Sequence, residues 1–255
     1  MKKLSLLLTL LALLCLLTPA MVQGETFNSG DFKCTLLEDG SAEIKKYSGK
    51  ASVLEIPAQL DGCAVTSIAK QAFTYCNSLT QVIIPEGVTS IGAEAFYNCN
   101  SLTQITLPDS VVSIDSNPFV KCFSLTDILV SPNSPAFEVI DGVLFDKAEK
   151  ALICYPYALT ASGYELPQGT LVIGNYAFSP CKSLTQITIP DSVTSIEDGA
   201  FYSRDALSEV AIPVSVTSIG ADAFGDCPLL TLTVFPGSFA ETFAQENGIP
   251  CKYAN

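Results

Sequence analysis

The sequence repeats itself with a period of 23 residues, and this constrains the fold more than any other feature of the chain. The phrase SLTQVIIPEGVTSIGAEAFYNC at 78–99 returns with few changes at 101–122, 183–204 and 206–227. One unit of this size cannot bury its own apolar side, so neighbouring units must stack and share a core. The chain is therefore predicted to form a solenoid in which each coil contacts mainly the coils next to it.

Each unit follows the pattern Leu-x-x-Ile-x-Ile-Pro-x-x-Val-x-x-Ile, followed by Ala-Phe-x-x-Cys. The Ile-x-Ile run favours a short β-strand, and the proline ends it because proline cannot donate to a strand ladder. The Val-Thr-Ser-Ile run predicts a second short extended piece, and the Ala-Phe segment predicts a tight, partly helical turn. Two units depart from the pattern: Arg204 stands where cysteine is expected, and the last coil, from Leu230, is out of register.

Two further segments and the C-terminal tail differ from the repeat. The spacing from Phe119 to Phe178 is 59 residues, which is 36 more than one repeat. The extra residues alternate apolar and polar around a charged turn at 146–150, which predicts an inserted β-hairpin. The segment at 32–49 has the same character and predicts an N-terminal hairpin cap, whereas 237–248 predicts a short amphipathic helix. Caps are expected because a bare terminal coil would expose its apolar residues.

We expect an export signal followed by a single solenoid domain. Lys2 and Lys3 precede an apolar run shorter than the roughly 20 residues of a membrane span, and Ala20 and Gly24 offer a cleavage site. Cys15 follows Leu14 instead of a small residue, which argues against a lipid anchor, and the rest of the chain contains no predicted membrane span. The expected boundaries are a signal peptide at 1–24 and a solenoid at 25–255, comprising an N-terminal cap (25–50), a first repeat block (51–136), the inserted hairpin (137–160), a second repeat block (161–236) and a C-terminal cap (237–255).

The composition argues against an enzyme. The chain contains no histidine, which excludes Ser-His-Asp and Cys-His catalysis and every histidine-containing metal site. Acidic residues such as Glu86, Asp109 and Asp191 recur at one repeat position, which is typical of solvated turns. The net charge of −13, or −15 without Lys2 and Lys3, disfavours nucleic acid and anionic membranes as partners. We therefore expect no catalytic residues, no cofactor and no metal.

Cysteine is the most reactive residue type in the repeat. Nine of the ten cysteines follow the predicted cleavage site, and an exported protein permits disulfides. Equivalent positions in adjacent coils lie about 5 Å apart but have parallel Cα–Cβ bonds, a poor geometry for a disulfide. Buried free thiols are thus predicted at the shared repeat position, occupied by Cys76, Cys99, Cys122, Cys181 and Cys227. Any disulfide is expected among the other mature cysteines, Cys34, Cys63, Cys154 and Cys251.

Candidate binding residues follow from strand alternation. If Leu79, Val82 and Ile84 point inward, the residues between them point outward and form a face along the solenoid. This predicted face comprises Thr80, Gln81, Ile83, Thr103, Gln104, Thr106, Asp127, Leu129, Thr185, Gln186, Thr188 and Glu209. The face either binds a partner or carries threonine only because threonine suits exposed strands.

Four outward positions are of particular interest. Ile83 and Leu129 are apolar residues on a polar face, although single exposed apolar residues are common. Tyr97 and Tyr202 adjoin the Ala-Phe turn, where they either contact a ligand or only cover the turn.

The units resemble those of the BspA-like, or Treponema pallidum type, leucine-rich-repeat family. The residues that carry the resemblance are the Ile-Pro-x-x-Val-Thr-Ser-Ile-Gly-x-x-Ala-Phe-x-x-Cys units, DGVLFDKAEKALICYP at 141–156 and GSFAETFAQENGI at 237–249. The resemblance implies a curved β-rich solenoid outside a bacterial cell that binds matrix proteins, other bacteria or surface glycans. It implies no shared catalytic residues.

The expected function is therefore an extracellular adhesion module, secreted or held at the cell surface, that recognises a protein or glycan through the solenoid surface. The alternative is a self-associating structural component of the envelope or matrix, because strand edges of the hairpin at 139–157 could pair between molecules. The oligomeric state stays open.

Overall fold

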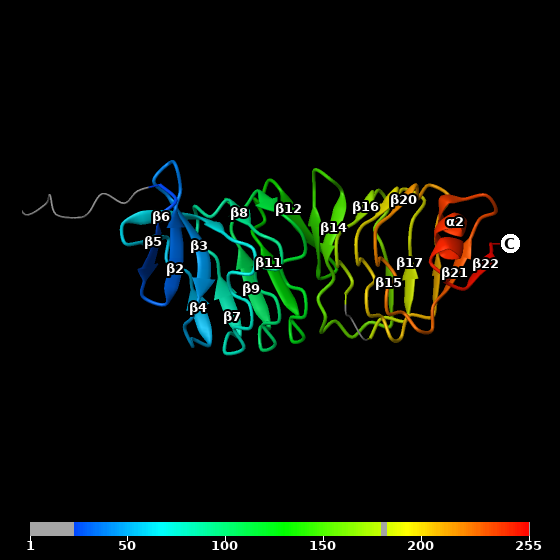
Figure 1. Ribbon diagram of the computed structural model, residues 1–255, viewed down its shortest axis with the longest axis horizontal. Helices are drawn as coiled ribbons and strands as arrows, with labels where there is room; N and C mark the ends of the chain where they lie inside the picture. Colours follow the sequence, from blue (N-terminus) through cyan, green and yellow to red (C-terminus); the bar gives the residue numbers. More distant parts are fainter. Residues whose placement is uncertain (1–22, 180–182, 255) are drawn as a thin grey trace, which may run out of the picture.

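The computed structural model describes residues 23–179 and 183–254 and confirms the predicted solenoid. The chain winds into about nine turns that stack into an elongated body, with β1–β3 (26–47) at one end and α2 and β22 (239–253) at the other (Figure 1). The predicted signal peptide lies almost entirely outside the described residues, and so does Cys181. No helix in the described part of the chain is long and apolar enough to cross a membrane.

Short strands and one helix make up the regular structure. The elements are β1 (Thr26–Ser29), β2 (Phe32–Leu36), β3 (Ala42–Tyr47), β4 (Val53–Glu55), β5 (Gln59–Leu60), β6 (Cys63–Ile68), β7 (Gln81–Ile83), β8 (Ser90–Ile91), β9 (Gln104–Leu107), β10 (Ser113–Ile114), β11 (Asp127–Val130), β12 (Phe137–Ile140), β13 (Val143–Asp146), β14 (Ala151–Cys154), β15 (Gly163–Glu165), β16 (Val172–Ile173), β17 (Gln186–Thr188), β18 (Ser195–Ile196), β19 (Glu209–Ala211), β20 (Ser218–Ile219), β21 (Thr231–Val234), α2 (Phe239–Glu246) and β22 (Cys251–Tyr253).

Each regular coil contributes one strand to each of two parallel ladders. The Ile-x-Ile strands β4, β7, β9 and β11 form one sheet, and the Val-Thr-Ser-Ile strands β6, β8 and β10 continue another. The register advances by one repeat per coil, so that Val82 pairs with Ile105 and Ile68 with Ile91. On the third side, the Ala-Phe turns are linked by backbone hydrogen bonds, such as the 2.7 Å bond from the Phe73 amide to the Ala95 carbonyl.

The repeat phenylalanines form a buried column in each half of the molecule. Phe73 and Phe96 are fully buried, and their ring centroids lie 4.9 Å apart. In the other half of the molecule, Phe201 lies 5.1 Å from both Phe178 and Phe224, with nearly parallel rings. Because each ring contacts the ring of the next coil, removing one would open a cavity along the axis of the solenoid.

The inserted segment is a three-stranded antiparallel meander, β12-β13-β14, that ends at Cys154 instead of 160. Its last strand joins the parallel sheet beside β16, where Leu152 pairs with Ile173. Leu144 and Ile153 pack into the core of the first half (23–136), whereas Phe145 and Leu152 pack into the core of the second half (137–254). The meander is thus a buried partition between two cores, and we call this region the joint.

The partition removes most of the strand edges that suggested self-association. Within the described residues, β13 and β14 pair on both sides, and only β12 keeps an open edge. The N-terminal cap has the same construction, because β1, β2 and β3 form a meander whose last strand pairs in parallel with β6.

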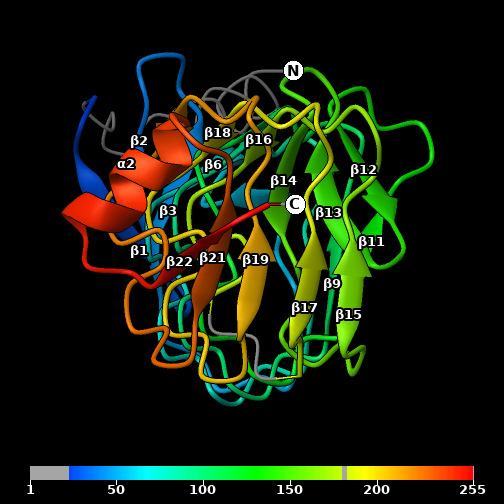
Figure 2. The ribbon, with the colours of Figure 1, turned by 90° about the vertical axis from the view of Figure 1, so that its right-hand side faces the viewer.

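The C-terminal cap contains the predicted helix and one additional strand (Figure 2). The Ser238 hydroxyl accepts a 3.2 Å hydrogen bond from the Glu241 amide and so caps α2, whose Ala240 and Ala244 are buried. Strand β22 then pairs in parallel with β21. Glu209 of β19 pairs with Thr231 of β21, an advance of 22 residues, which confirms that the last coil is shifted by one position.

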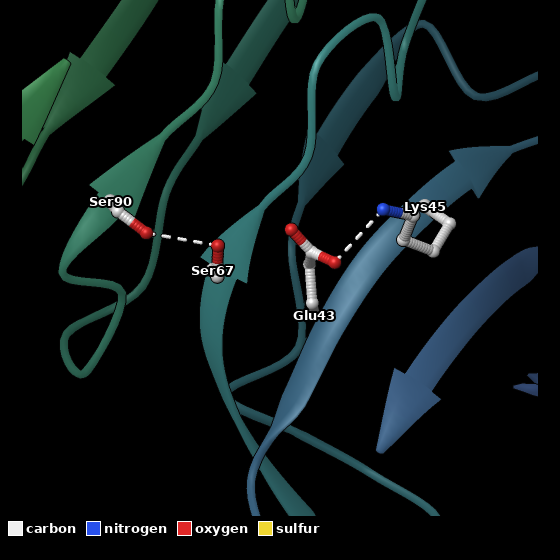
Figure 3. A network of polar contacts seen from close by, with 4 residues as sticks. All are labelled: Glu43, Lys45, Ser67 and Ser90. Carbon is white, nitrogen blue, oxygen red and sulfur yellow. Dashed lines mark hydrogen bonds and ion pairs between the residues drawn. The ribbon is translucent and has the colours of Figure 1, made fainter. Parts of the chain in front are cut away.

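Side-chain hydroxyls link successive coils on the outside of the sheets. The Thr89 hydroxyl donates to the Thr66 carbonyl at 3.1 Å, and the Ser90 and Ser67 hydroxyls lie 2.9 Å apart. Figure 3 shows this serine pair beside the ion pair between Lys45 and Glu43 of β3, which is 3.0 Å long. The recurring Thr-Ser of the repeat therefore has a structural role that runs along the solenoid axis.

The repeat cysteines act as hydrogen-bond donors. Cys99 and Cys122 are buried as predicted, whereas Cys76 and Cys227 at the same position are only partly buried. The thiols of Cys99 and Cys122 each lie 3.0 Å from a phenylalanine carbonyl 26 positions upstream, that of Phe73 and Phe96 respectively. Arg204 is fully buried and supplies the same donor in its coil, with Nη1 2.7 Å from the Phe178 carbonyl. Cysteine thus provides a small apolar side chain and a donor at one position. Free thiols in the described part of the chain include Cys34, Cys63, Cys76, Cys99, Cys122, Cys227 and Cys251.

We expect iodoacetamide to modify exposed Cys251 well before the buried thiols in the native protein. Burial raises the pKa of Cys34 to about 11 and that of Cys76 to about 12, so both keep their protons at pH 8.

The same thiols make stability depend on pH, because a thiol in the unfolded chain ionises near pH 9.0. Stability should therefore be constant below that pH and fall above it, by about 1.4 kcal/mol per pH unit for each such thiol. Mass spectrometry and urea unfolding between pH 7 and pH 11 measure the two effects.

The variant Cys34→Ala is the control for the pH effect, because it should make the alkaline loss of stability shallower. Equal labelling rates for Cys34, Cys76 and Cys251 in the native state would contradict the burial of Cys34 and the partial burial of Cys76.

Candidate functional site

The outward positions of the first strand face lie where alternation places them. Val82 of β7 is buried, whereas Gln81 and Ile83 are partly exposed. The same alternation holds in β9 and β11, so outward side chains form two rows across the sheet. The first row contains Gln81, Gln104 and Asp127, and the second contains Ile83, Thr106 and Leu129.

The predicted face is divided into two, which corrects the expectation of one continuous surface. Gln186, Thr188 and Glu209 lie on a different sheet, formed by β15, β17, β19, β21 and β22. Within the described residues, β11 and β15 do not pair with each other. The physical reason is the partition: after β14 the chain crosses the joint, where the Ala158 amide bonds to the Leu125 carbonyl at 3.1 Å, before β15 begins.

Several predicted contact residues already have partners inside the molecule. The hydroxyls of Thr80, Thr103 and Thr185 donate to carbonyls one coil upstream, at 2.9, 2.9 and 3.0 Å. Glu209 forms a 2.8 Å ion pair with Lys252 of β22. Hydrogen bonds from Lys252 and then from Thr233 lower the pKa of Glu209. These side chains hold coils together, so fewer of their hydrogen-bonding groups are free to contact a ligand.

The second row borders a hollow of about 420 Å³ at the ends of β7, β9 and β11. Ile83, Thr106 and Leu129 line it, together with Pro85 and Pro108 of the following turns. We call this feature the strand-end hollow. The structure therefore brings together both apolar residues that stand out on the predicted face, and Leu129 is 45% exposed.

The repeat prolines are the part of the hollow that the sequence analysis missed. Pro85 and Pro108 follow the strands of two successive coils at the repeat spacing, and Ser131 takes this position after β11. The period carries the signal, but from the sequence alone the prolines are interpreted only as strand terminators. The lining is largely apolar, with Glu86 as its one ionisable residue in the described chain. Such a surface can bind by excluding water, and it contains no arrangement for acid–base or nucleophilic chemistry. The described residues also contain no group of three or more Cys, Asp or Glu that could hold a metal ion.

Comparison with known families agrees with this architecture. The model for the BspA type leucine-rich-repeat region matches six copies, over residues 47–152 and 153–246. The chain belongs to the BspA-type leucine-rich-repeat family. The boundary between the two matches falls inside β14, at the partition between the two cores.

Solved structures of bacterial repeat proteins share the fold. A leucine-rich-repeat protein from Eubacterium ventriosum is 27% identical, with a TM-score of 0.58; the match covers 84% of this chain and 73% of that protein. A leucine-rich cell surface protein from Faecalibacterium prausnitzii is 30% identical, with a TM-score of 0.51 and the same coverage of this chain, which spans only 55% of that protein. No curated protein sequence matches this chain.

Proteins of the BspA-type family are bacterial proteins that are secreted or held at the cell surface. Leucine-rich-repeat solenoids of this kind are typically protein-binding and non-enzymatic. The geometry of the strand face agrees with that general role.

Proposed function

We propose that this BspA-type protein is an extracellular adhesion module that recognises a protein or glycan, with a protein contacting the strand-end hollow. The observation that carries the proposal is the convergence of Ile83, Thr106 and Leu129 on one hollow. Apolar side chains that lie together in a depression form the kind of centre that protein interfaces bury, surrounded by a polar rim.

The surroundings of the hollow supply such a rim. Gln81 and Gln104 lie in the adjacent row, and their side chains make no hydrogen bond to the described residues. Asp127 extends the row and accepts a 2.6 Å hydrogen bond from Thr126. The strands beneath are locked by parallel ladders, so contact residues are already held in place and little ordering is needed on binding.

The test is an array of extracellular-matrix proteins and glycans probed with the purified chain. We expect a saturable protein partner whose affinity falls at least about tenfold in Leu129→Asp and in Ile83→Asp, because each change places a charge in the apolar centre. Val112→Asp is the matched control, because Val112 is 54% exposed in the first half and is not part of this hollow. Its affinity should be unchanged.

The binding results test the position of the site and the adhesion function separately. Binding that survives both substitutions would move the contact surface away from the strand-end hollow. A complete absence of partners on the array would contradict the adhesion function.

A further inference from the structure

Four tyrosines from both halves of the molecule line a second hollow, on the side of the Ala-Phe turns. Tyr75 and Tyr97 come from the first half, and Tyr176 and Tyr202 from the second. The hollow has a volume of about 470 Å³, within the range of sites for small ligands. We call it the tyrosine cleft.

The cleft exists because the coil at the joint lacks an Ala-Phe turn. The chain passes from β14 to Pro156 through Tyr155, whose ring lies 5.4 Å from that of Phe178. No Ala-Phe turn therefore stands between the turns that contain Phe119 and Phe178. The Asn117 amide bridges these turns with a 2.9 Å hydrogen bond to the Tyr176 carbonyl. Among the described residues, no residue between Lys121 and Tyr176 lines the cleft.

The aromatic rings are held in place by neighbouring groups. The rings of Tyr75 and Tyr97 meet edge to face, with centroids 5.8 Å apart. A Cβ atom at Gly199 would overlap the ring of Tyr176, and one at Gly225 would crowd the ring of Tyr202. The glycines therefore let these rings lie against the backbone of the next coil. Covering the turn and facing the cleft are thus compatible roles for the same tyrosines.

Hydrogen-bonding groups lie between the rings. Gln71 Nε2 donates to Glu94 Oε2 at 2.5 Å, and both side chains line the cleft. The Lys121 ammonium lies 5.3 Å from the centroid of the Tyr97 ring. A ligand in the cleft would therefore meet aromatic surface, a carboxylate acceptor and a cationic donor.

We infer that the tyrosine cleft binds an uncharged oligosaccharide, at a site separate from the strand-end hollow. Sugar rings present C–H faces that pack on aromatic rings, and their hydroxyls both donate to Glu94 and accept from Lys121. A net charge of −13 disfavours acidic glycans. A proline-rich peptide also packs on tyrosines, but Gln71 donates to only one oxygen of Glu94, and prolines have no N–H to offer the other. Covering that second oxygen without a donor is unfavourable.

The test uses the full chain with cellohexaose, chitohexaose, xylohexaose and maltohexaose as probes. The protein has no tryptophan and nine tyrosines, of which four line the cleft, so a change in tyrosine emission on adding a probe reports binding. Calorimetry is the second readout, and the tyrosine variants assign the signal to the cleft. We expect saturable binding of at least one probe, with affinity lowered at least about tenfold in Tyr97→Ala and in Tyr176→Ala.

Two controls distinguish this site from the rest of the surface. Tyr253→Ala removes a tyrosine that is 58% exposed and lies outside the cleft, and Leu129→Asp disables the strand-end hollow. Both should bind the sugar as the unaltered chain does, and circular dichroism should confirm that all variants fold. Failure of all four sugars, with or without binding of a polyproline peptide, would overturn the inference; so would sugar binding that persists in folded Tyr97→Ala and Tyr176→Ala.

Discussion

Replacing Phe201 by alanine is expected to lower the free energy of unfolding by about 3–5 kcal/mol. Phe201 is fully buried, and its ring stacks between those of Phe178 and Phe224 at 5.1 Å on each side. The substitution removes both stacking contacts and leaves a cavity that rigid neighbouring coils cannot fill. Urea unfolding followed by circular dichroism measures the loss.

Phe235→Ala is the matched control, because it deletes the same side chain where it is 42% exposed. Its effect should stay within about 0.5 kcal/mol. A loss of less than about 1 kcal/mol in Phe201→Ala would contradict the phenylalanine stack of the second half as a main source of stability.

Leu144→Ala and Leu152→Ala are each expected to lower the free energy of unfolding by about 2–5 kcal/mol. The two substitutions should weaken different halves of the molecule. Both leucines are fully buried on adjacent strands of the joint. Leu144 packs into the core of the first half and Leu152 into the core of the second. Because a solenoid transmits stability mainly between neighbouring coils, each cavity should weaken its own side most.

Native-state hydrogen exchange distinguishes the two variants. Leu144→Ala should lose protection mainly in β11 and β9, and Leu152→Ala mainly in β16 and β18. Identical exchange patterns would mean that the two cores unfold as one unit, which would contradict the role of the meander as a partition.

The regular coils could be predicted because their signal is local and repeated. Val82 and Ile105 are buried, and Gln81 and Ile83 lie outward, as the alternation in one repeat predicts. The burial of Phe96 and Cys99 follows equally from their phase in the repeat. The donor role of cysteine was missed, because the Phe73 carbonyl that Cys99 contacts is identified only when the coils are stacked.

The candidate sites were predicted less completely. Alternation placed Ile83 and Leu129 outward, but it could not show that they border one hollow, or that the hydroxyl of Thr80 is bonded to Ser52. Tyr97 and Tyr202 were recognised as ambiguous, and their shared cleft depends on contacts across the joint.

The 23-residue period is enough to predict the solenoid, the phase of its buried columns and the positions of the irregular segments, because it specifies which residues meet one coil away. The construction of the joint, by contrast, follows from contacts that form only when the whole chain is folded. There the two faces of one meander enter two different cores, the outward sheet divides, and the Phe119 and Phe178 turns come together. These contacts join residues that share no repeat spacing, so they depend on how the whole irregular segment packs.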